Sequence, residues 1–163
     1  MVDTITIEKI VNALVVRLKG KPHETINIQL EIEQMLPVNN EEFRLEVKDI
    51  SVPWSHNNLA INAFHVERLT MAVKFFLWIT RTIQGNNGHA TYSLNNIPRG
   101  YYDIKISGTA IKDAKEVDLR VSASATAQLN HEGVLDYNYN IQNIVEGVFK
   151  ARAGDKESQF EIS

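Results

Sequence analysis

Hydrophobic and polar residues alternate along most of the chain, which is the pattern of β-strands with one buried face. In residues 24–32 every second side chain is apolar: Ile26, Ile28, Leu30 and Ile32. Residues 43–52 alternate in the same way, through Phe43, Leu45 and Val47. A strand is also expected over 10–18, because the Gly and Pro of the intervening "KGKPH" favour a turn before the 24–32 strand.

The stretch 61–83 is ambiguous, because its apolar residues fit two different periods. Phe64, Leu69, Val73 and Phe76 could form one stripe of a helix, whereas "VKFFLWITRTI" is rich in β-branched and aromatic residues. We therefore expect one short helix near 61–72, with helix and strand both open over 61–76, followed by a strand. "GNNGH" at 85–89 favours a hairpin turn, since Asn-Gly accepts positive φ.

From residue 89 to the end, short strand-like segments alternate with turn residues about every 8–12 positions, as in all-β sandwiches. The candidate strands are "HATYSL", "YYDIKISG", "EVDLRVSASATAQL", "VLDYNYNI", "VFKARAG" and "SQFEI". Two stretches of this region also match each other with an offset of 45 to 47 residues. Gly88, Tyr92, Ile97, Gly100, Tyr102 and Gly108 align with Gly133, Tyr137, Ile144, Gly147, Phe149 and Gly154, while Pro98 faces Val145. The shared unit is strand, turn, strand, with a core aromatic residue in each strand, so Tyr102 and Tyr137 are expected to be buried. Turn chemistry alone and a true duplication both explain the match.

The segments "GHATYSLNNIPRGYYDIKISG" and "HEGVLDYNYNIQNIVEGVFKARAGDKESQFEI" carry a family resemblance. They resemble the "G…F-x-L…I-P-x-G-x-Y-x-I-x-V" units of immunoglobulin-like and transthyretin-like β-sandwich modules, which recur in surface and secreted proteins of archaea and bacteria. The resemblance covers residues 70–163. It implies an immunoglobulin-like antiparallel β-sandwich, a non-catalytic surface or adhesive role, an extracellular or cell-surface location, and a module cut from a longer protein.

Composition and charge narrow the classes of partner. The chain has 163 residues, of which 44% are hydrophobic, and this fits a single domain over 1–163. Its net charge is −3, so neither a nucleic-acid partner nor binding to an anionic membrane surface is expected, and no membrane insertion is expected either. The first twenty residues fit neither a signal peptide nor a membrane anchor. There is no cysteine, and no phosphate-binding, dinucleotide-binding, serine-elbow or zincin motif occurs, so we expect no enzyme activity and no cofactor.

Three aromatic residues are candidate ligand contacts, because exposed rings on a sheet can hold sugars: Trp54, Tyr101 and Tyr139. Weak candidates for a metal site are His56, His65 and Glu67, although no metal is expected. The leading interpretation is a structural or interaction module with a protein or carbohydrate ligand. A carbohydrate-binding module and a self-assembling intracellular or viral structural protein are the alternatives, and the oligomeric state is open.

Overall fold

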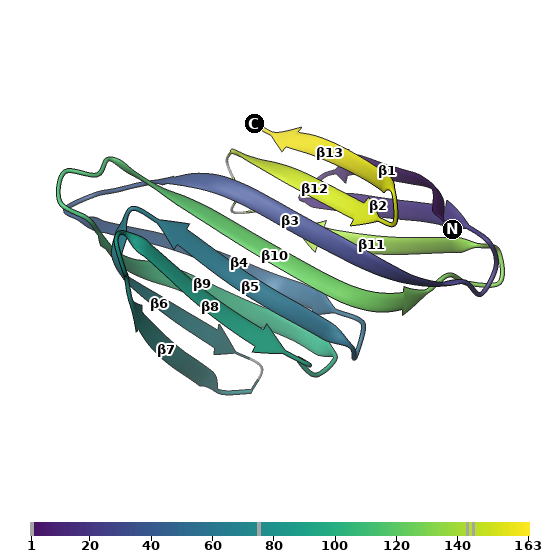
Figure 1. The fold of residues 1–163 in the computed structure, drawn as a ribbon, viewed down its shortest axis with the longest axis horizontal. Helices are drawn as coiled ribbons and strands as arrows, with labels where there is room; N and C mark the ends of the chain where they lie inside the picture. The colour runs from purple at the N-terminus through teal and green to yellow at the C-terminus, as the bar shows by residue number, and fades with distance from the viewer. Residues whose placement is uncertain (1, 75, 143, 145) are drawn as a thin grey trace.

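A computed structural model describes residues 2–74, 76–142, 144 and 146–163 of the chain. Its strands form three antiparallel sheets (Figure 1). The largest sheet has the order β13 (Lys156–Ile162), β12 (Gly147–Ala153), β3 (Thr25–Pro37), β10 (Glu116–Gln128), β5 (Asn57–Phe64), β8 (His89–Asn95). A four-stranded sheet has the order β4 (Glu42–Val52), β9 (Gly100–Ala110), β6 (Val66–Lys74), β7 (Trp78–Gln84). The third has the order β1 (Val2–Ile10), β2 (Ala13–Gly20), β11 (Val134–Asn140).

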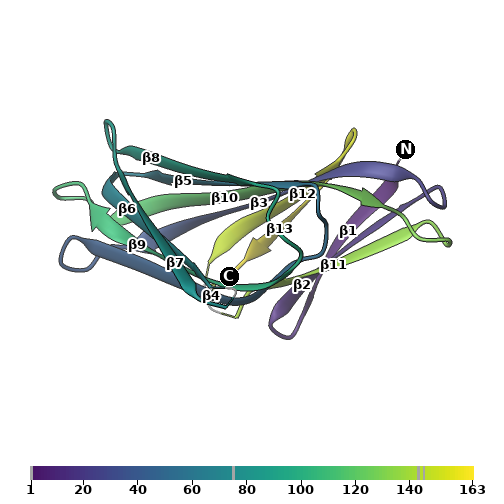
Figure 2. The same cartoon turned by 90° about the horizontal axis from the view of Figure 1, so that it is seen from below.

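The three sheets make two layers (Figure 2). The six-stranded sheet is one layer, and the two smaller sheets lie along its inner face as the other. The strands β3 and β10 hold this arrangement together, because they pair over thirteen residues from Thr25↔Gln128 to Pro37↔Glu116. Both strands are therefore long enough to lie beneath both smaller sheets.

Each smaller sheet buries its own hydrophobic core against the six-stranded sheet. Beneath the three-stranded sheet the core includes Leu14, Leu18, Ile28 and Phe149. Beneath the four-stranded sheet it includes Phe43, Ile61, Leu69, Ile106 and Leu119. The alternating apolar residues of β3 and β10 supply both cores, which explains why the sequence pattern of these strands is so regular.

The two smaller sheets meet where β11 runs beside the end of β4. The Tyr137 hydroxyl donates to the carbonyl oxygen of Ser51 at 2.7 Å, and Asn140 Nδ2 donates to the carbonyl oxygen of Lys48 at 2.7 Å. Near this seam β4 contains a bulge, with Asp49 at a φ of 55°. Side chains of β11 therefore bridge the sheets at a point where the backbone of β4 is irregular.

The prediction of a mainly β fold is confirmed, and the segments 24–32 and 43–52 lie in β3 and β4. The Asn-Gly turn is confirmed as well, because Asn86 and His89 exchange backbone hydrogen bonds around Asn87 and Gly88, both at positive φ. The described residues contain no helix, and so none that could cross a membrane.

The helix predicted near 61–72 is wrong, because this segment forms β5 and β6. His65 separates the two strands with a φ of 71°, and β6 shifts register between Val66 and Arg68. Because of these two irregularities, the inward residues Ala63, Val66 and Leu69 are spaced three residues apart in the sequence, which is close to the spacing of one face of a helix. Of the rest of 61–76, residue 75 lies outside the described part of the chain.

The strand predicted over 10–18 is confirmed for residues 13–18, which lie in β2, but it begins later than predicted because a turn at Val11 and Asn12 separates β2 from β1. Val11 has a φ of 52°, which an apolar β-branched residue rarely adopts, so the sequence carries no turn signal there.

The two matched stretches form connections between layers. The chain passes from β8 in the six-stranded sheet to β9 in the four-stranded sheet, and from β11 to β12 it passes between layers again. Tyr102 and Phe149 are each the third residue of the strand that follows, and both are buried. The residue that faces Pro98 in the alignment, Val145, lies outside the described residues.

Candidate binding cavity between the sheets

A cavity of about 120 Å³ lies between the two layers, at the junction of the two hydrophobic cores. Its lining comes from β3 and β10 on one side and from β4, β9 and β11 on the other. Residues of both cores therefore border it, and it sits beside the seam where β11 meets β4.

The cavity exists because the middle of β10 carries small side chains. Residues 121–127 read "VSASATA", and Ala123 and Ala125 line the cavity. Ala123 is paired with Leu30 on one side, and Ala125 is paired with Ile28. Elsewhere on the inward face of β10, the larger side chains of Val117 and Leu119 are completely buried. Two alanines in succession leave space that larger side chains would occupy.

Aromatic rings from both layers and from the β4–β5 connection also line the cavity. The rings of Trp54 and Tyr137 lie 5.3 Å apart between centroids, and those of Tyr139 and Phe149 lie 5.4 Å apart. The Tyr102 hydroxyl donates to the Pro98 carbonyl oxygen at 2.6 Å, so this phenol is satisfied by the backbone, as is that of Tyr137. Tyr102 and Tyr137 can thus offer apolar ring surface while their hydroxyls stay paired.

Burial also changes the acidity of two of these phenols. It raises the pKa of Tyr139 to about 12, and it raises the pKa of Tyr137 further. Both phenols therefore stay neutral at physiological pH. Among the described lining residues, Glu31 is the only one with a side chain charged near neutral pH.

Asn57 fixes the two connections that border the cavity. Its Nδ2 donates to the carbonyl oxygens of Trp54, at 2.6 Å, and Ile97, at 2.9 Å. Its Oδ1 accepts from the backbone N–H of Ile97 at 2.8 Å. The connection from β4 to β5 is in this way tied to the connection from β8 to β9, which holds Trp54 in place beside the cavity.

Two of the three predicted ligand contacts, Trp54 and Tyr139, line the same cavity. The third, Tyr101, does not, because it is 69% exposed on the outer face of β9. Sequence reasoning assigned Tyr102 and Tyr137 to the core and did not single out Ala123 or Ala125. The signal for the alanines was present in the run "SASATA".

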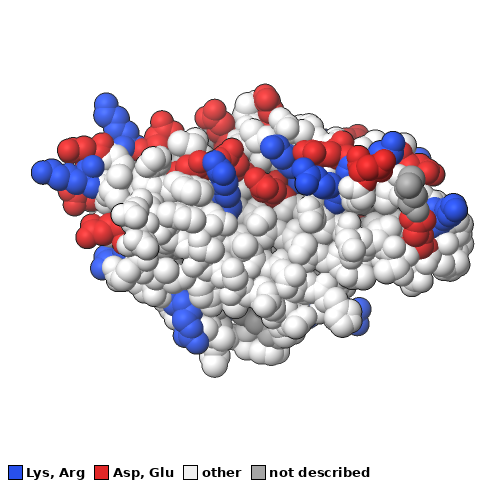
Figure 3. All heavy atoms as spheres, in the orientation of Figure 1, with Lys and Arg blue, Asp and Glu red and all other residues white. Residues whose placement is uncertain are grey.

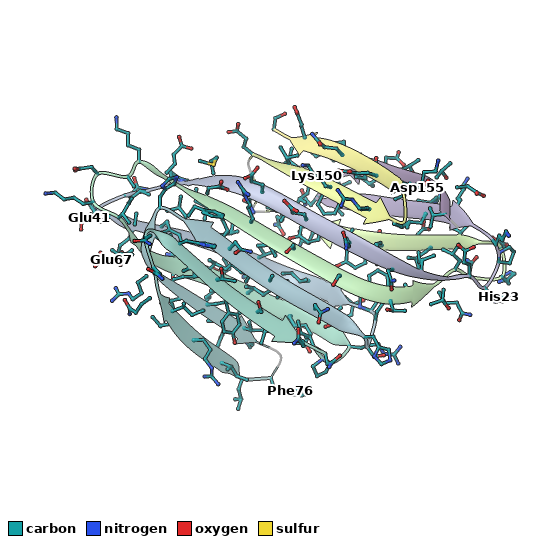
Figure 4. The ribbon with its side chains drawn as sticks, in the orientation of Figure 1. His23, Glu41, Glu67, Phe76, Lys150 and Asp155 are labelled. Atoms are coloured by element: carbon teal, nitrogen blue, oxygen red, sulfur yellow. The ribbon has the colours of Figure 1, made fainter. Side chains whose placement is uncertain are left out.

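The weak metal candidates do not come together. His56 precedes β5 and His65 follows it, so about 30 Å of extended strand separates them. Glu67 lies beyond His65 on β6, at the end of the molecule where Figure 4 labels it. All three side chains are exposed. Among the described residues, no group of three or more His, Cys, Asp or Glu side chains could hold a metal ion.

Comparison with known proteins does not identify a family. No protein-family model matches the chain, and no curated protein sequence matches it significantly. The chemistry of the cavity is therefore the basis for a functional argument. The cavity offers mostly apolar and aromatic surface, which suits an apolar group.

Proposed function

We propose that this chain is a non-catalytic binding module whose cavity holds the apolar part of a small ligand, about the size of one aromatic ring. The observation that carries this proposal is the incompletely filled space between Ala125 and the rings of Trp54 and Tyr137. Burial of apolar surface there would supply the binding free energy, at about 25 cal/mol per Å².

The size of the cavity supports this ligand class. An apolar cavity of about 150 Å³ in another protein stays free of water and binds benzene or xenon. The present cavity, at about 120 Å³, is of similar volume and also has an apolar lining. A ring or a short branched chain matches that volume, and a longer ligand would leave its remainder outside.

A carbohydrate ligand receives less support from this geometry. Sugar hydroxyls need hydrogen-bond partners, whereas the amide of Asn57 and the phenols of Tyr102 and Tyr137 are already paired with backbone groups. The layered antiparallel sheets support the immunoglobulin-like resemblance at the level of fold class only. We keep the role of an interaction module at a cell surface as part of the proposal.

The proposal is tested by titrating the protein with N-phenyl-1-naphthylamine, a neutral dye that fluoresces in apolar sites, and by displacing the dye with benzene derivatives. Saturable binding with a single site per chain is the expected result. Maltose and similar sugars should not displace the dye. A signal that never saturates would contradict a defined site.

Variants of β10 locate the dye. Ala125→Leu fills the cavity and should abolish dye binding, whereas Ser122→Leu adds the same side chain to the other face of the same strand and should not. Equal loss of binding in both variants, or in neither, would contradict the assignment of the cavity as the site.

A further inference from the structure

The hairpin between β6 and β7 carries the most concentrated exposed apolar surface of the described chain. Four consecutive residues at the tip of this hairpin are exposed to an unusual degree for their type: Phe76 80%, Leu77 78%, Trp78 40% and Ile79 59%. Figure 4 shows Phe76 at the extremity of the molecule, away from both cores. Exposed apolar clusters of this kind mark interaction sites rather than ordinary surface.

Basic side chains flank this cluster. The ammonium group of Lys105 lies 4.4 Å from the Trp78 ring centroid, and that of Lys74 lies 5.8 Å from it. Arg81 follows on β7, on the face opposite Trp78, while the acidic neighbours are Asp103, paired with Lys74, and Glu46, paired with Lys105. Three basic groups thus stand against two acidic groups, although the whole chain has a net charge of −3. The charged atoms along the lower margin of the molecule in Figure 3 are basic as well.

We propose that the tip of the β6–β7 hairpin, residues 76–79 with Lys74, Arg81 and Lys105, docks on the surface of an anionic lipid bilayer. The argument is charge and residue type together. Tryptophan with phenylalanine and leucine favours the boundary between headgroups and acyl chains, and adjacent Lys and Arg are attracted to anionic lipids. This docking is peripheral and differs from insertion of a spanning segment.

Another aromatic residue extends the same surface. Tyr101 is 69% exposed on β9, two residues before Asp103, which pairs with Lys74 at the end of β6. Tyrosine shares the interfacial preference of tryptophan. The proposal therefore assigns a role to Tyr101, the one predicted ligand contact that does not line the cavity. It does not depend on what the cavity binds.

The test is co-sedimentation with phosphatidylcholine vesicles that contain or lack phosphatidylserine. Binding only to the vesicles with phosphatidylserine, weakened by added salt, is expected. Leu77→Ser should weaken it at least about tenfold, and Lys74→Glu with Lys105→Glu should do so as well. The matched control is Val11→Ser, because Val11 is 82% exposed in the β1–β2 turn; that variant should bind as the parent protein does.

Vesicles made with brominated lipids add a local readout. Contact with bromine should quench the fluorescence of Trp78, and Trp78→Phe, which leaves Trp54 as the single tryptophan, should lose most of this quenching. The proposal is overturned if the protein ignores anionic vesicles, if Leu77→Ser binds them unchanged, or if sedimentation shows instead that the tip joins two copies of the chain.

Discussion

Substitution of Ala125 by leucine is the most informative change to this protein, because it alters the cavity and little else. Ala125 lies on the inward face of β10 and is paired with Ile28 on β3 and Asn57 on β5. Leucine adds three carbon atoms at a position that borders empty space of about 120 Å³. The substitution should therefore stabilise the protein, which is the opposite of the usual effect of a core change.

The magnitude follows from the atoms added. Burial of three carbons contributes about 2.4 kcal/mol, at about 0.8 kcal/mol each, and the loss of leucine rotamer freedom costs about 0.5–1 kcal/mol. A net gain of about 1.5 kcal/mol in the free energy of unfolding remains. For a chain of this length the melting temperature should then rise by about 3–6 °C.

Urea unfolding measures this gain directly. The midpoint for Ala125→Leu should rise with an unchanged m-value, because the surface exposed on unfolding changes little. Ser122→Leu, which places the same side chain on the outer face, should not be stabilised. Destabilisation of Ala125→Leu by about 1 kcal/mol or more would indicate an already filled interior and would refute the reasoning.

Three further variants test side-chain interactions elsewhere in the fold as well as at the cavity. Asn57→Ala should destabilise the protein by about 2 kcal/mol in urea unfolding, because three hydrogen bonds are lost; an unchanged midpoint would contradict the role of this side chain. The Arg17 guanidinium, whose Nε lies 2.7 Å from the Asp136 carboxylate, lowers the pKa of Asp136. Asp136→Asn should therefore reduce the free energy of unfolding at pH 7, and by progressively less as the pH falls below about 4. A difference that does not depend on pH would argue against the ion pair. Burial raises the pKa of Tyr139 to about 12, so this phenol contributes stability below about pH 10 that is lost as the pH rises toward 12. Tyr139→Phe should therefore lose less stability between pH 10 and pH 12 than the parent protein. Parallel plots of unfolding free energy against pH for the two proteins would exclude the effect.

The regular strands could be predicted from the sequence, and the irregular ones could not. β3 keeps a strict period of two because its inward residues face both cores without a bulge. At β5 and β6 the bend at His65 shifts the period, and two strands then resemble a helix. A left-handed residue other than glycine leaves almost no trace in the sequence, so neither this bend nor the turn at Val11 was foreseeable.

The cavity was only half predictable, for a related reason. Trp54 and Tyr139 could be selected as aromatic residues in suitable positions, but the layer that each would face depends on long-range pairing. The alignment of Tyr102 with Phe149 and of Tyr92 with Tyr137 indicated core aromatics, and Tyr102, Tyr137 and Phe149 do line the cavity. A cavity cannot be recognised from a sequence pattern, because its presence depends on which side chains from other strands face the small residues of β10.

A crystal structure of the protein soaked with bromobenzene would test the central claim most directly, because bromine can be located by its anomalous scattering. The proposal predicts one bromine site between Ala125 and the rings of Trp54 and Tyr137, absent from crystals of Ala125→Leu. Bromine found only at the exposed β6–β7 hairpin, or no ordered bromine at a saturating concentration, would contradict a binding cavity between the sheets.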